Sequence, residues 1–385
     1  MNSSKQNKKI KVAWFASAFI GRSASGTAQT ARKLVIHLLQ DFSDEVEVIL
    51  LTKNESEVEL LKKEKCFNRA QIVEMPHVVG KWMKSSRQFY KFCLINRSIE
   101  IDILHYSVSR VYPFFWLFPA KKIVCTFHAG GDVTVPRDFF TASREIYNFI
   151  VKKQWHNFDA IVADSTFASN EISQAYRIPK EFITTIYLGA DNLWGVVEED
   201  FERDLNLVLV MGRWQLYKNL HTVINAFKKF EVPHNEGLRL KVIGKSGLID
   251  KALKKDALNG FPKNQIELIE YLSDEELARE YRKATVVFHP SINEGFGLPA
   301  FEAFGEGARL VVHKGTPADE ILSSQIGISS NNLLDEQKVI ESYRSVLAQS
   351  FGNVQKRRDF IRSIDATWVQ ATAKYVALYK EVLKK

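Results

Sequence analysis

Two glutamates in the last third of the chain flank a glycine-containing segment, and their spacing suits a ligand rich in hydroxyl groups. Glu294 and Glu302 stand eight positions apart, with Gly295 and Gly297 between them. Carboxylates accept hydrogen bonds from hydroxyl groups, and glycines let the backbone approach a ligand closely. These residue types together indicate a site that grips a polar, sugar-like molecule.

The elements that must position the glutamates are a buried strand and a helix. Residues 285–290, Thr-Val-Val-Phe-His-Pro, are typical of a buried strand, and Pro299 suits the first turn of a helix, where no N–H is needed. The glycines then lie in the strand-to-helix loop, where free N–H groups and the helix dipole attract anions. A nucleotide sugar combines hydroxyls with phosphate. Alternatively, Glu302 only complements its own helix dipole, which is worth roughly 0.3–1 kcal/mol.

Two cations follow another predicted strand, at residues 205–211. Arg213 comes just after it, and Lys218 lies five residues further on. Ligands of open α/β sheets bind at the carboxyl ends of the strands. Fixed cations can neutralise a diphosphate there, because Coulomb energies grow as the local dielectric falls. We therefore expect Arg213 and Lys218 to form a diphosphate clamp with the amides of Gly297 and Leu298, although either cation alone is more often a surface residue.

The order and spacing of these motifs resemble a known enzyme family. The segment 293–303 resembles the E-x7-E signature of retaining glycosyltransferases of family 4, which have the GT-B fold. Residues 268–277 and 281–284 look like the stretch that precedes this signature. Met211-Gly212-Arg213-Trp214, with Lys218-Asn219-Leu220, looks like the upstream phosphate-binding segment. The resemblance spans at least residues 206–320.

The resemblance implies a role for each candidate residue. Glu302 should bind the ribose hydroxyls and Glu294 a hydroxyl of the donor sugar, and His128 resembles the family histidine that reaches that sugar. Catalytic roles are therefore expected for His128, Glu294, Arg213 and Lys218. Contacts to the donor are expected from Gly26, Arg213, Lys218, Tyr271, Leu272, Glu294, Gly295, Phe296, Gly297, Leu298 and Glu302.

The sequence departs from the family pattern at several positions. Ala129 stands where the family often has Asp after the histidine, and the acid comes later, at Asp132. A single Gly26 represents the family's glycine pair. Asn219 replaces a frequent glycine, and Ala308-Arg309 replaces a small residue and a proline. The changes at Asn219 and at Ala308-Arg309 affect the shape of the backbone more than the chemistry of the ligand site.

Other polar residues at predicted strand ends have structural interpretations. Ser165 matches a family serine but is equally well explained as a helix N-cap worth roughly 1 kcal/mol. His105 and His289 are better interpreted as core or supporting residues. A lone histidine is more often structural than catalytic, which is also the alternative for His128.

The activity implied is transfer of a hexose or deoxyhexose from a nucleotide-diphosphate sugar to a glycan or lipid-linked glycan, in surface polysaccharide biosynthesis. No motif supplies the nucleophile of a double displacement, so front-face attack with retention is expected. No carboxylate cluster resembles a metal site, so we expect neither a metal nor another cofactor. Two alternatives stay open: another GT-B activity, such as epimerisation of a nucleotide sugar, and a catalytically silent GT-B scaffold.

Length and element order predict two domains. The chain has 385 residues, more than one core usually holds, and strand-like runs alternate with helical ones throughout. We predict an α/β protein of GT-B type, with two doubly wound, Rossmann-like domains facing a central cleft. The acceptor-binding domain covers residues 1–195, the donor-binding domain covers 196–366, and a last helix at 367–385 crosses back onto the first domain.

The composition excludes several protein classes. With 45% hydrophobic and 25% charged residues, the chain is typical of a globular protein. No apolar stretch approaches about 18 residues, and the N-terminus lacks the apolar core of a signal peptide, so we expect a cytoplasmic protein. The cysteines Cys66, Cys93 and Cys125 lack metal-ligand spacing, which agrees with a reducing compartment.

The net charge of +8 is concentrated in the first half. Residues 1–195 hold 26 Lys and Arg against 19 Asp and Glu, a net charge of +7. Residues 196–385 hold the remaining 27 against 26, a net charge of +1. No nucleic-acid-binding motif accompanies this surplus, so we expect no nucleic-acid partner. Cations recur at helical intervals beside large apolar residues over residues 81–94. This pattern suits an amphipathic helix on the anionic inner face of the cell membrane, or a solvated basic helix whose aromatic residues face the core.

Overall fold

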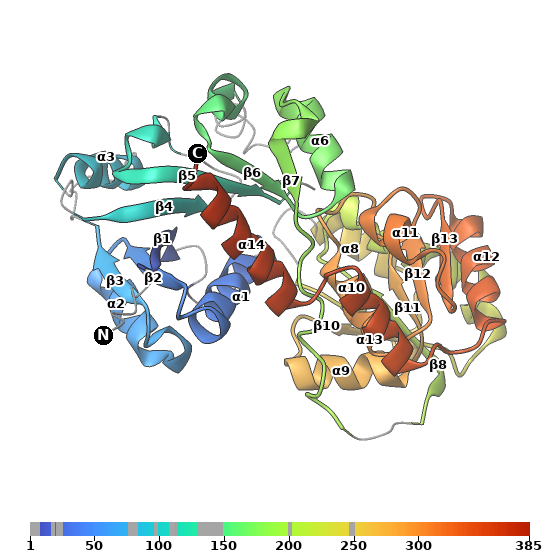
Figure 1. Cartoon of the computed structure of the whole chain (residues 1–385). Helices are drawn as coiled ribbons and strands as arrows, with labels where there is room; N and C mark the ends of the chain where they lie inside the picture. The colour runs from blue at the N-terminus through green and yellow to red at the C-terminus, as the bar shows by residue number, and fades with distance from the viewer. Residues whose placement is uncertain are drawn as a thin grey trace. The chain divides into compact units, whose positions relative to one another are not determined.

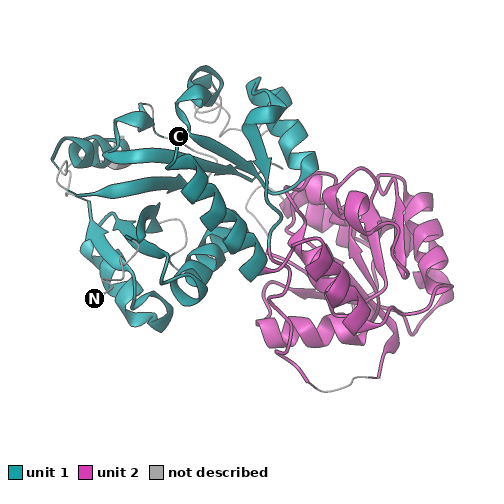
Figure 2. Ribbon diagram, in the orientation of Figure 1, with its two compact units in different colours: residues 1–188, 368–385 teal, residues 189–367 magenta. Residues whose placement is uncertain are grey.

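The computed structural model describes residues 8–16, 20, 26–75, 84–95, 99–107, 112, 114–128, 149–198, 202–245 and 251–385. The chain divides into two compact units (Figure 2). Unit 1 comprises Met1–Leu188 and Trp368–Lys385, and unit 2 comprises Gly189–Thr367. The C-terminal segment therefore belongs to the same unit as the N-terminus.

Unit 1 is built on a seven-stranded sheet in which every described pairing is parallel (Figure 1). Its strand order is β3-β2-β1-β4-β5-β6-β7. The strands are β1 (Ile10–Phe15), β2 (Val46–Thr52), β3 (Gln71–Glu74), β4 (Ile101–Tyr106), β5 (Ala120–Phe127), β6 (Ala160–Ala163) and β7 (Ile183–Thr185). The helices described are α1 (Gly26–Asp41), α2 (Glu55–Lys63), α3 (Lys84–Ile95), α6 (Thr166–Tyr176) and α14 (Trp368–Val382).

Unit 2 is built on a six-stranded parallel sheet with the order β10-β9-β8-β11-β12-β13. The strands are β8 (Asp204–Met211), β9 (Arg239–Ile243), β10 (Ile266–Ile269), β11 (Ala284–His289), β12 (Leu310–His313) and β13 (Ile328–Asn331). The helices are α7 (Leu220–Phe230), α8 (Lys251–Leu258), α9 (Asp274–Lys283), α10 (Leu298–Gly305), α11 (Pro317–Leu322), α12 (Glu336–Leu347) and α13 (Val354–Ser363).

Both sheets are doubly wound, which confirms the predicted fold class. In each sheet the strand order reverses beside the first strand, so the switch point lies between β1 and β4 in unit 1 and between β8 and β11 in unit 2. Central strands are apolar because helices cover both faces, and every residue of β4 and of β11 is buried. Ligands of such sheets bind at the carboxyl edge beside a switch point.

Unit 2 begins earlier than the boundary predicted after residue 195. The N–H of Ala190 donates to the carbonyl of Ala366 at 2.9 Å, and the side chain of Leu193 is buried. Residues from Gly189 onward therefore already pack within unit 2. The sequence at this point, Gly-Ala-Asp-Asn, is typical of a loop and gives little sign of this packing.

Candidate functional site

The candidate site of unit 2 lies at the switch point of its sheet. A 3-10 turn at Leu216–Lys218 follows β8, and the loop that holds the first glutamate follows β11. The N–H of Ile292 donates to the carbonyl of Tyr217 at 2.9 Å, so the two loops are tied together. Because β8 and β11 are neighbours, residues distant in sequence meet at one edge of the sheet.

Glu294 lies between two basic side chains. The ammonium of Lys218 forms an ion pair with Oε1 of Glu294, and both side chains are 15% exposed. Nε2 of His289 lies 3.2 Å from the same oxygen, close enough for a charge interaction but poorly aligned for a hydrogen bond. Burial acts to raise the pKa of Glu294, but Lys218 and His289 outweigh it and hold that pKa well below its usual range.

The backbone conformation explains why glycine stands at position 297. Gly297 precedes α10 with a φ of 88°, in the left-handed region that favours glycine. A Cβ at this position would lie 3.4 Å from Nε2 of His289. Pro299 occupies the first turn of α10, as predicted. Phe296 is buried and stacks on Phe301 at 4.2 Å, which fixes the loop that also carries Gly295 and Leu298.

Glu302 lies one helical turn into α10. Its Oε1 accepts a hydrogen bond from Nδ2 of Asn192 at 3.0 Å. Burial raises the pKa of Tyr281, and the charge of Glu302 raises it further. Glu302 is only partly buried, so the carboxylate stays accessible to a ligand.

Arg213 has a fixed backbone and an exposed side chain. The N–H groups of its neighbours Gly212 and Trp214 donate to Ile243 and Lys245 at 3.1 and 3.2 Å. Its guanidinium makes no hydrogen bond or ion pair with any residue in the described ranges. Unlike Lys218, Arg213 therefore has no carboxylate partner among the described residues.

Two further loops of unit 2 follow the carboxyl ends of the neighbouring strands β9 and β10. Gly244, which follows β9, approaches the preceding loop so closely that a Cβ would lie 1.8 Å from the carbonyl oxygen of Gly212. Tyr271 and Leu272 follow β10, and the ring of Tyr271 is 66% exposed. An exposed ring at a carboxyl edge is available to a ligand.

In unit 1, His128 is part of a hydrogen-bonded chain across three adjacent strand ends. Its Nδ1 lies 2.6 Å from Oδ2 of Asp164, which follows β6, and its Nε2 lies 2.9 Å from Oγ of Ser107, which follows β4. A carboxylate accepts, so Nδ1–H donates to Asp164 and Nε2 accepts from the serine hydroxyl. The side chains of His128 and Asp164 are only 7% and 2% exposed.

The sequence did not indicate either partner of His128, Asp164 or Ser107. The contact of His289 with Glu294 fits the supporting role expected for this histidine. The signal available was position, since each follows or ends a buried strand. Ser165 caps α6, accepting from the N–H of Ala168 at 3.0 Å.

Gly26 begins α1, and its carbonyl accepts a hydrogen bond from Thr30 Oγ1 at 3.1 Å. A Cβ at Gly26 would meet no atom within 4 Å, so the described surroundings do not explain the glycine. Several other predicted positions lie outside the described residues, namely Ser23, Ala24, Ser25, Lys81, Trp82, Met83, Ala129, Asp132, Ser246 and Gly247.

Within the described ranges, no three His, Cys, Asp or Glu side chains gather closely enough to hold a metal ion. The helices that the structure describes are too short or too polar to cross a bilayer.

Two family models match the chain, one in each half. Residues 24–192 match the model described as Glycosyltransferase Family 4, and residues 197–364 match the model described as Glycosyl transferases group 1. The chain belongs to glycosyltransferase family 4. It is therefore a glycosyltransferase, and the predicted resemblance is confirmed.

Two curated relatives of this chain are named as O-antigen chain mannosyltransferases. It is 25% identical over 314 residues to the O-antigen chain mannosyltransferase RfbU of Salmonella typhimurium, which covers 75% of this chain and 81% of the relative. It is 23% identical over 273 residues to the O-antigen chain mannosyltransferase B of Escherichia coli, and the match covers 68% of this chain and 70% of the relative.

Solved structures show the GT-B fold at low sequence identity. The sucrose-phosphate synthase of Thermosynechococcus elongatus superposes with a TM-score of 0.70 at 15% identity, covering 98% of this chain and 99% of that one. Anabaena HepE, solved in complex with UDP and glucose, superposes with a TM-score of 0.60 at 12% identity, covering 98% and 97%.

Proposed function

We propose that this family 4 glycosyltransferase moves a hexose from a nucleotide-diphosphate sugar to a glycan or lipid-linked glycan during surface polysaccharide biosynthesis, with retention of the anomeric configuration. The names of two relatives, both O-antigen chain mannosyltransferases, support the acceptor class and make mannose the first sugar to test. The complex of HepE with UDP and glucose supports the donor class.

The observation that carries the proposal is the contact of Lys218 and His289 with Glu294 at the switch point of unit 2. A carboxylate kept ionised beside an ammonium can accept a hydrogen bond from a sugar hydroxyl while the ammonium faces an adjacent phosphate. Exposed Arg213 supplies a second cation, and the glycine loop supplies backbone N–H groups. Glu302 accepts from the ribose hydroxyls.

The chemical step we propose is front-face substitution. The bond between the anomeric carbon and the diphosphate oxygen breaks, and a bond to the acceptor oxygen forms on the same face. The departing diphosphate takes the proton of the acceptor hydroxyl, so charge and protons balance. Arg213 and Lys218 stabilise the negative charge that develops on the diphosphate, which lowers the barrier most when the donor excludes water from the site.

We further propose that no metal is required, because two protein cations can neutralise the diphosphate. Transfer should then continue at an unchanged rate when a chelator such as EDTA is added to purified protein. Loss of activity in EDTA, restored by adding a divalent ion, would overturn this part of the proposal. The assay must hold ionic strength constant, because diphosphate binding is sensitive to salt.

Donor binding and the stereochemistry of the product test the proposal together. UDP, GDP, dTDP and ADP are screened by thermal denaturation, where a ligand at about 100 times its Kd stabilises by roughly 2.7 kcal/mol. We expect one nucleotide to stabilise the protein and its mannose or glucose conjugate to yield a product with the donor's anomeric configuration by NMR. An inverted product would contradict retention.

The same assay separates the alternatives. Conversion of the donor to a different nucleotide sugar without an acceptor would indicate epimerisation. No stabilisation by any of the four nucleotides would indicate a catalytically silent scaffold.

A further inference from the structure

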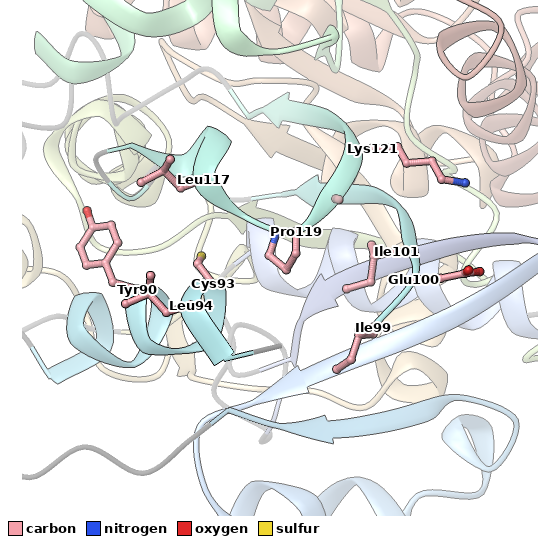
Figure 3. A pocket seen from close by; sticks show the side chains of 10 residues that line it. Tyr90, Cys93, Leu94, Ile99, Glu100, Ile101, Leu117, Pro119 and Lys121 are labelled. Atoms are coloured by element: carbon pink, nitrogen blue, oxygen red, sulfur yellow. The ribbon is translucent and has the colours of Figure 1, made fainter. Parts of the chain in front are cut away.

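Unit 1 contains a cavity at the edge of its sheet opposite His128. The cavity has a volume of about 560 Å³ and lies where β4 begins at Ile101 and β5 begins at Ala120 (Figure 3). His128 and Asp164 follow the carboxyl ends of β5 and β6. The cavity is therefore separate from the candidate site, and its volume is within the range of about 300–1,000 Å³ that is usual for small-molecule sites.

The wall of the cavity is apolar. Helix α3 contributes Cys93 and Leu94, and the segment before β5 contributes Leu117 and Pro119. Burial raises the pKa of the Cys93 thiol to about 11, so it stays neutral at physiological pH. Such a wall offers a ligand few directional hydrogen bonds and suits a hydrocarbon chain.

The two charged residues at the rim have partners outside the cavity. The ammonium of Lys121 lies 2.7 Å from Asp102, and the carboxylate of Glu100 lies 3.2 Å from Lys8. Figure 3 shows the charged ends of Lys121 and Glu100 directed away from the space enclosed by the apolar side chains. A charged ligand group would therefore sit outside the cavity.

The two segments that line the cavity, α3 and the residues before β5, carry exposed apolar side chains, and Leu94 and Leu117 among them line the cavity itself. Leu94 is 71% exposed, Ile95 58%, Leu117 56% and Phe114 52%. Other aromatic residues of the same segments are buried, and Phe92 stacks on Phe118 at 5.3 Å. Helix α3 is thus anchored by one face and presents aliphatic side chains on another. Because α3 contacts the segment before β5, exposed apolar side chains on both point to a contact surface rather than a core.

Cations share the exposed face of α3. Arg87 lies four residues before Lys91, and Lys91 lies three residues before Leu94. These spacings place all three on one side of the helix. Both cations are exposed, and neither forms an ion pair with a described residue. A helix with apolar side chains flanked by free cations is complementary to an anionic lipid surface.

We propose that this cavity and the exposed apolar side chains of the two segments that line it bind one acyl chain of an anionic phospholipid, which holds unit 1 at a membrane surface. The apolar wall receives the chain, while Arg87 and Lys91 face the headgroup phosphate. This inference goes beyond the proposed sugar transfer and stands whether or not that proposal holds, because the cavity shares no residue with the site.

Vesicle co-sedimentation tests the surface. The full chain should bind vesicles containing phosphatidylglycerol and not vesicles of phosphatidylcholine alone. Leu94→Asp should weaken binding at least about tenfold, because an apolar side chain is replaced by a charge. Leu60→Asp is the matched control, since Leu60 on α2 is also exposed, at 45%, and should change binding by less than about twofold. Lys91→Gln should weaken binding about fivefold, and Lys62→Gln on α2 should not.

A single-chain probe tests the cavity itself. The fluorescence of cis-parinaric acid should rise on binding at a ratio of one to one, and Ala120→Phe, which fills the cavity, should abolish that rise. If Ala120→Phe does not fold, Leu117→Asp replaces it: this change places a charge at an exposed residue of the cavity wall and should weaken the binding of parinaric acid at least about tenfold.

The proposal would be overturned if Leu94→Asp and Leu60→Asp bound vesicles equally well. It would also be overturned if parinaric acid failed to bind, bound despite a folded Ala120→Phe, or bound Leu117→Asp as tightly as wild type. Leu94→Asp could also split a dimer, by size-exclusion chromatography, in a protein that does not bind vesicles; the patch would then be covered by a second copy of the chain.

Discussion

Glu294 is the residue whose ionisation matters most to the site. It is nearly buried, and it stays charged because Lys218 and His289 lie against one of its oxygens. An ionised carboxylate in this position is a stronger acceptor for a sugar hydroxyl than a neutral acid would be. The pair also keeps the ammonium of Lys218 in place before any diphosphate arrives.

Acid should weaken the fold of unit 2 through Glu294. Its folded pKa lies below the ordinary value of about 4.3. The ionised form therefore stabilises the fold at neutral pH, and this contribution is lost as the pH falls below about 4.3 toward the folded pKa. We expect the difference in urea midpoint between wild type and Glu294→Gln to shrink between about pH 7 and pH 3. A difference that stays constant over this range would contradict the shift.

His128 should depend on Asp164 for its tautomer. Asp164→Asn keeps the shape but removes the charged acceptor at Nδ1, so we expect kcat/KM to fall about ten- to a hundredfold, the equivalent of one hydrogen bond to a charged group. The unfolding midpoint should barely move. Asp41→Asn is the matched control, because Asp41 forms the exposed pair with His37 on α1 at 2.7 Å. Equal rates for the two variants would assign Asp164 a purely structural role.

Residue identity predicted the candidate site of unit 2 better than the hydrogen-bonded chain around His128 in unit 1. Glu294, Lys218 and Arg213 belong to a motif with fixed spacing, so the sequence alone located them. Ser107 and Asp164 became partners of His128 only because β4, β5 and β6 are neighbours in the sheet. The order of strands is not encoded in any local pattern, so these contacts could not be predicted.

At the scale of elements, most strands were predictable and two edge strands were not. Strands β4 and β6 have the predicted bounds, 101–106 and 160–163, because buried and mostly apolar runs are recognisable in the sequence. Strands β3 and β13, with the sequences Gln-Ile-Val-Glu and Ile-Ser-Ser-Asn, were missed. Each has four residues, half or more of them polar, and lies at an edge of its sheet, so periodicity carries little signal.

The departure at Asn219 also has an explanation at this scale. Asn219 has a φ of 55°, a left-handed conformation that glycine and asparagine tolerate best. Its Nδ2 donates to the carbonyl of Leu333 at 2.7 Å, and its Oδ1 accepts from Thr222 at 2.6 Å. The asparagine thus keeps the turn before α7 while adding two hydrogen bonds that glycine could not make.

Helix α14 is fixed to the sheet of unit 1 by buried hydroxyl groups. The hydroxyl of Tyr379 lies 2.5 Å from Nδ1 of His105, and that of Tyr375 lies 3.0 Å from Oγ1 of Thr126. Thr126 in turn lies 2.8 Å from Nε2 of His105. Burial holds the pKa of His105 well below its usual range, so the ring is neutral and both nitrogens need a partner.

Removing the hydroxyl of Tyr379 should therefore destabilise unit 1. Tyr379→Phe leaves a buried imidazole nitrogen without a partner, at a cost of about 1–3 kcal/mol in the free energy of unfolding. Tyr106→Phe is the matched control, because the buried hydroxyl of Tyr106 has no hydrogen-bond partner in the described part of the chain. Urea denaturation followed by circular dichroism measures both. Equal stabilities for the two variants would show that the contact with His105 contributes nothing.

At the scale of the whole molecule, length and alternation were sufficient to predict two doubly wound sheets. The return of the C-terminal helix to unit 1 came from the resemblance to GT-B enzymes, and the structure assigns Trp368–Lys385 to that unit. The charge pattern predicted a possible membrane-facing helix at residues 81–94. The apolar residues before β5 that belong to the proposed lipid-binding surface needed the fold, because they are about twenty positions from those of α3 in sequence.

The central claim is that Lys218 stabilises the departing diphosphate. The most direct test is the rate of nucleoside diphosphate release at saturating donor and acceptor for wild type, Lys218→Ala and Lys229→Ala. Lys229 is an exposed lysine of the same unit that pairs with Glu336 at 3.4 Å. We predict that Lys218→Ala lowers kcat by about 10²–10³, as loss of one group that stabilises developing charge does, and that Lys229→Ala does not. A Lys218→Ala enzyme that matches wild type would contradict the account.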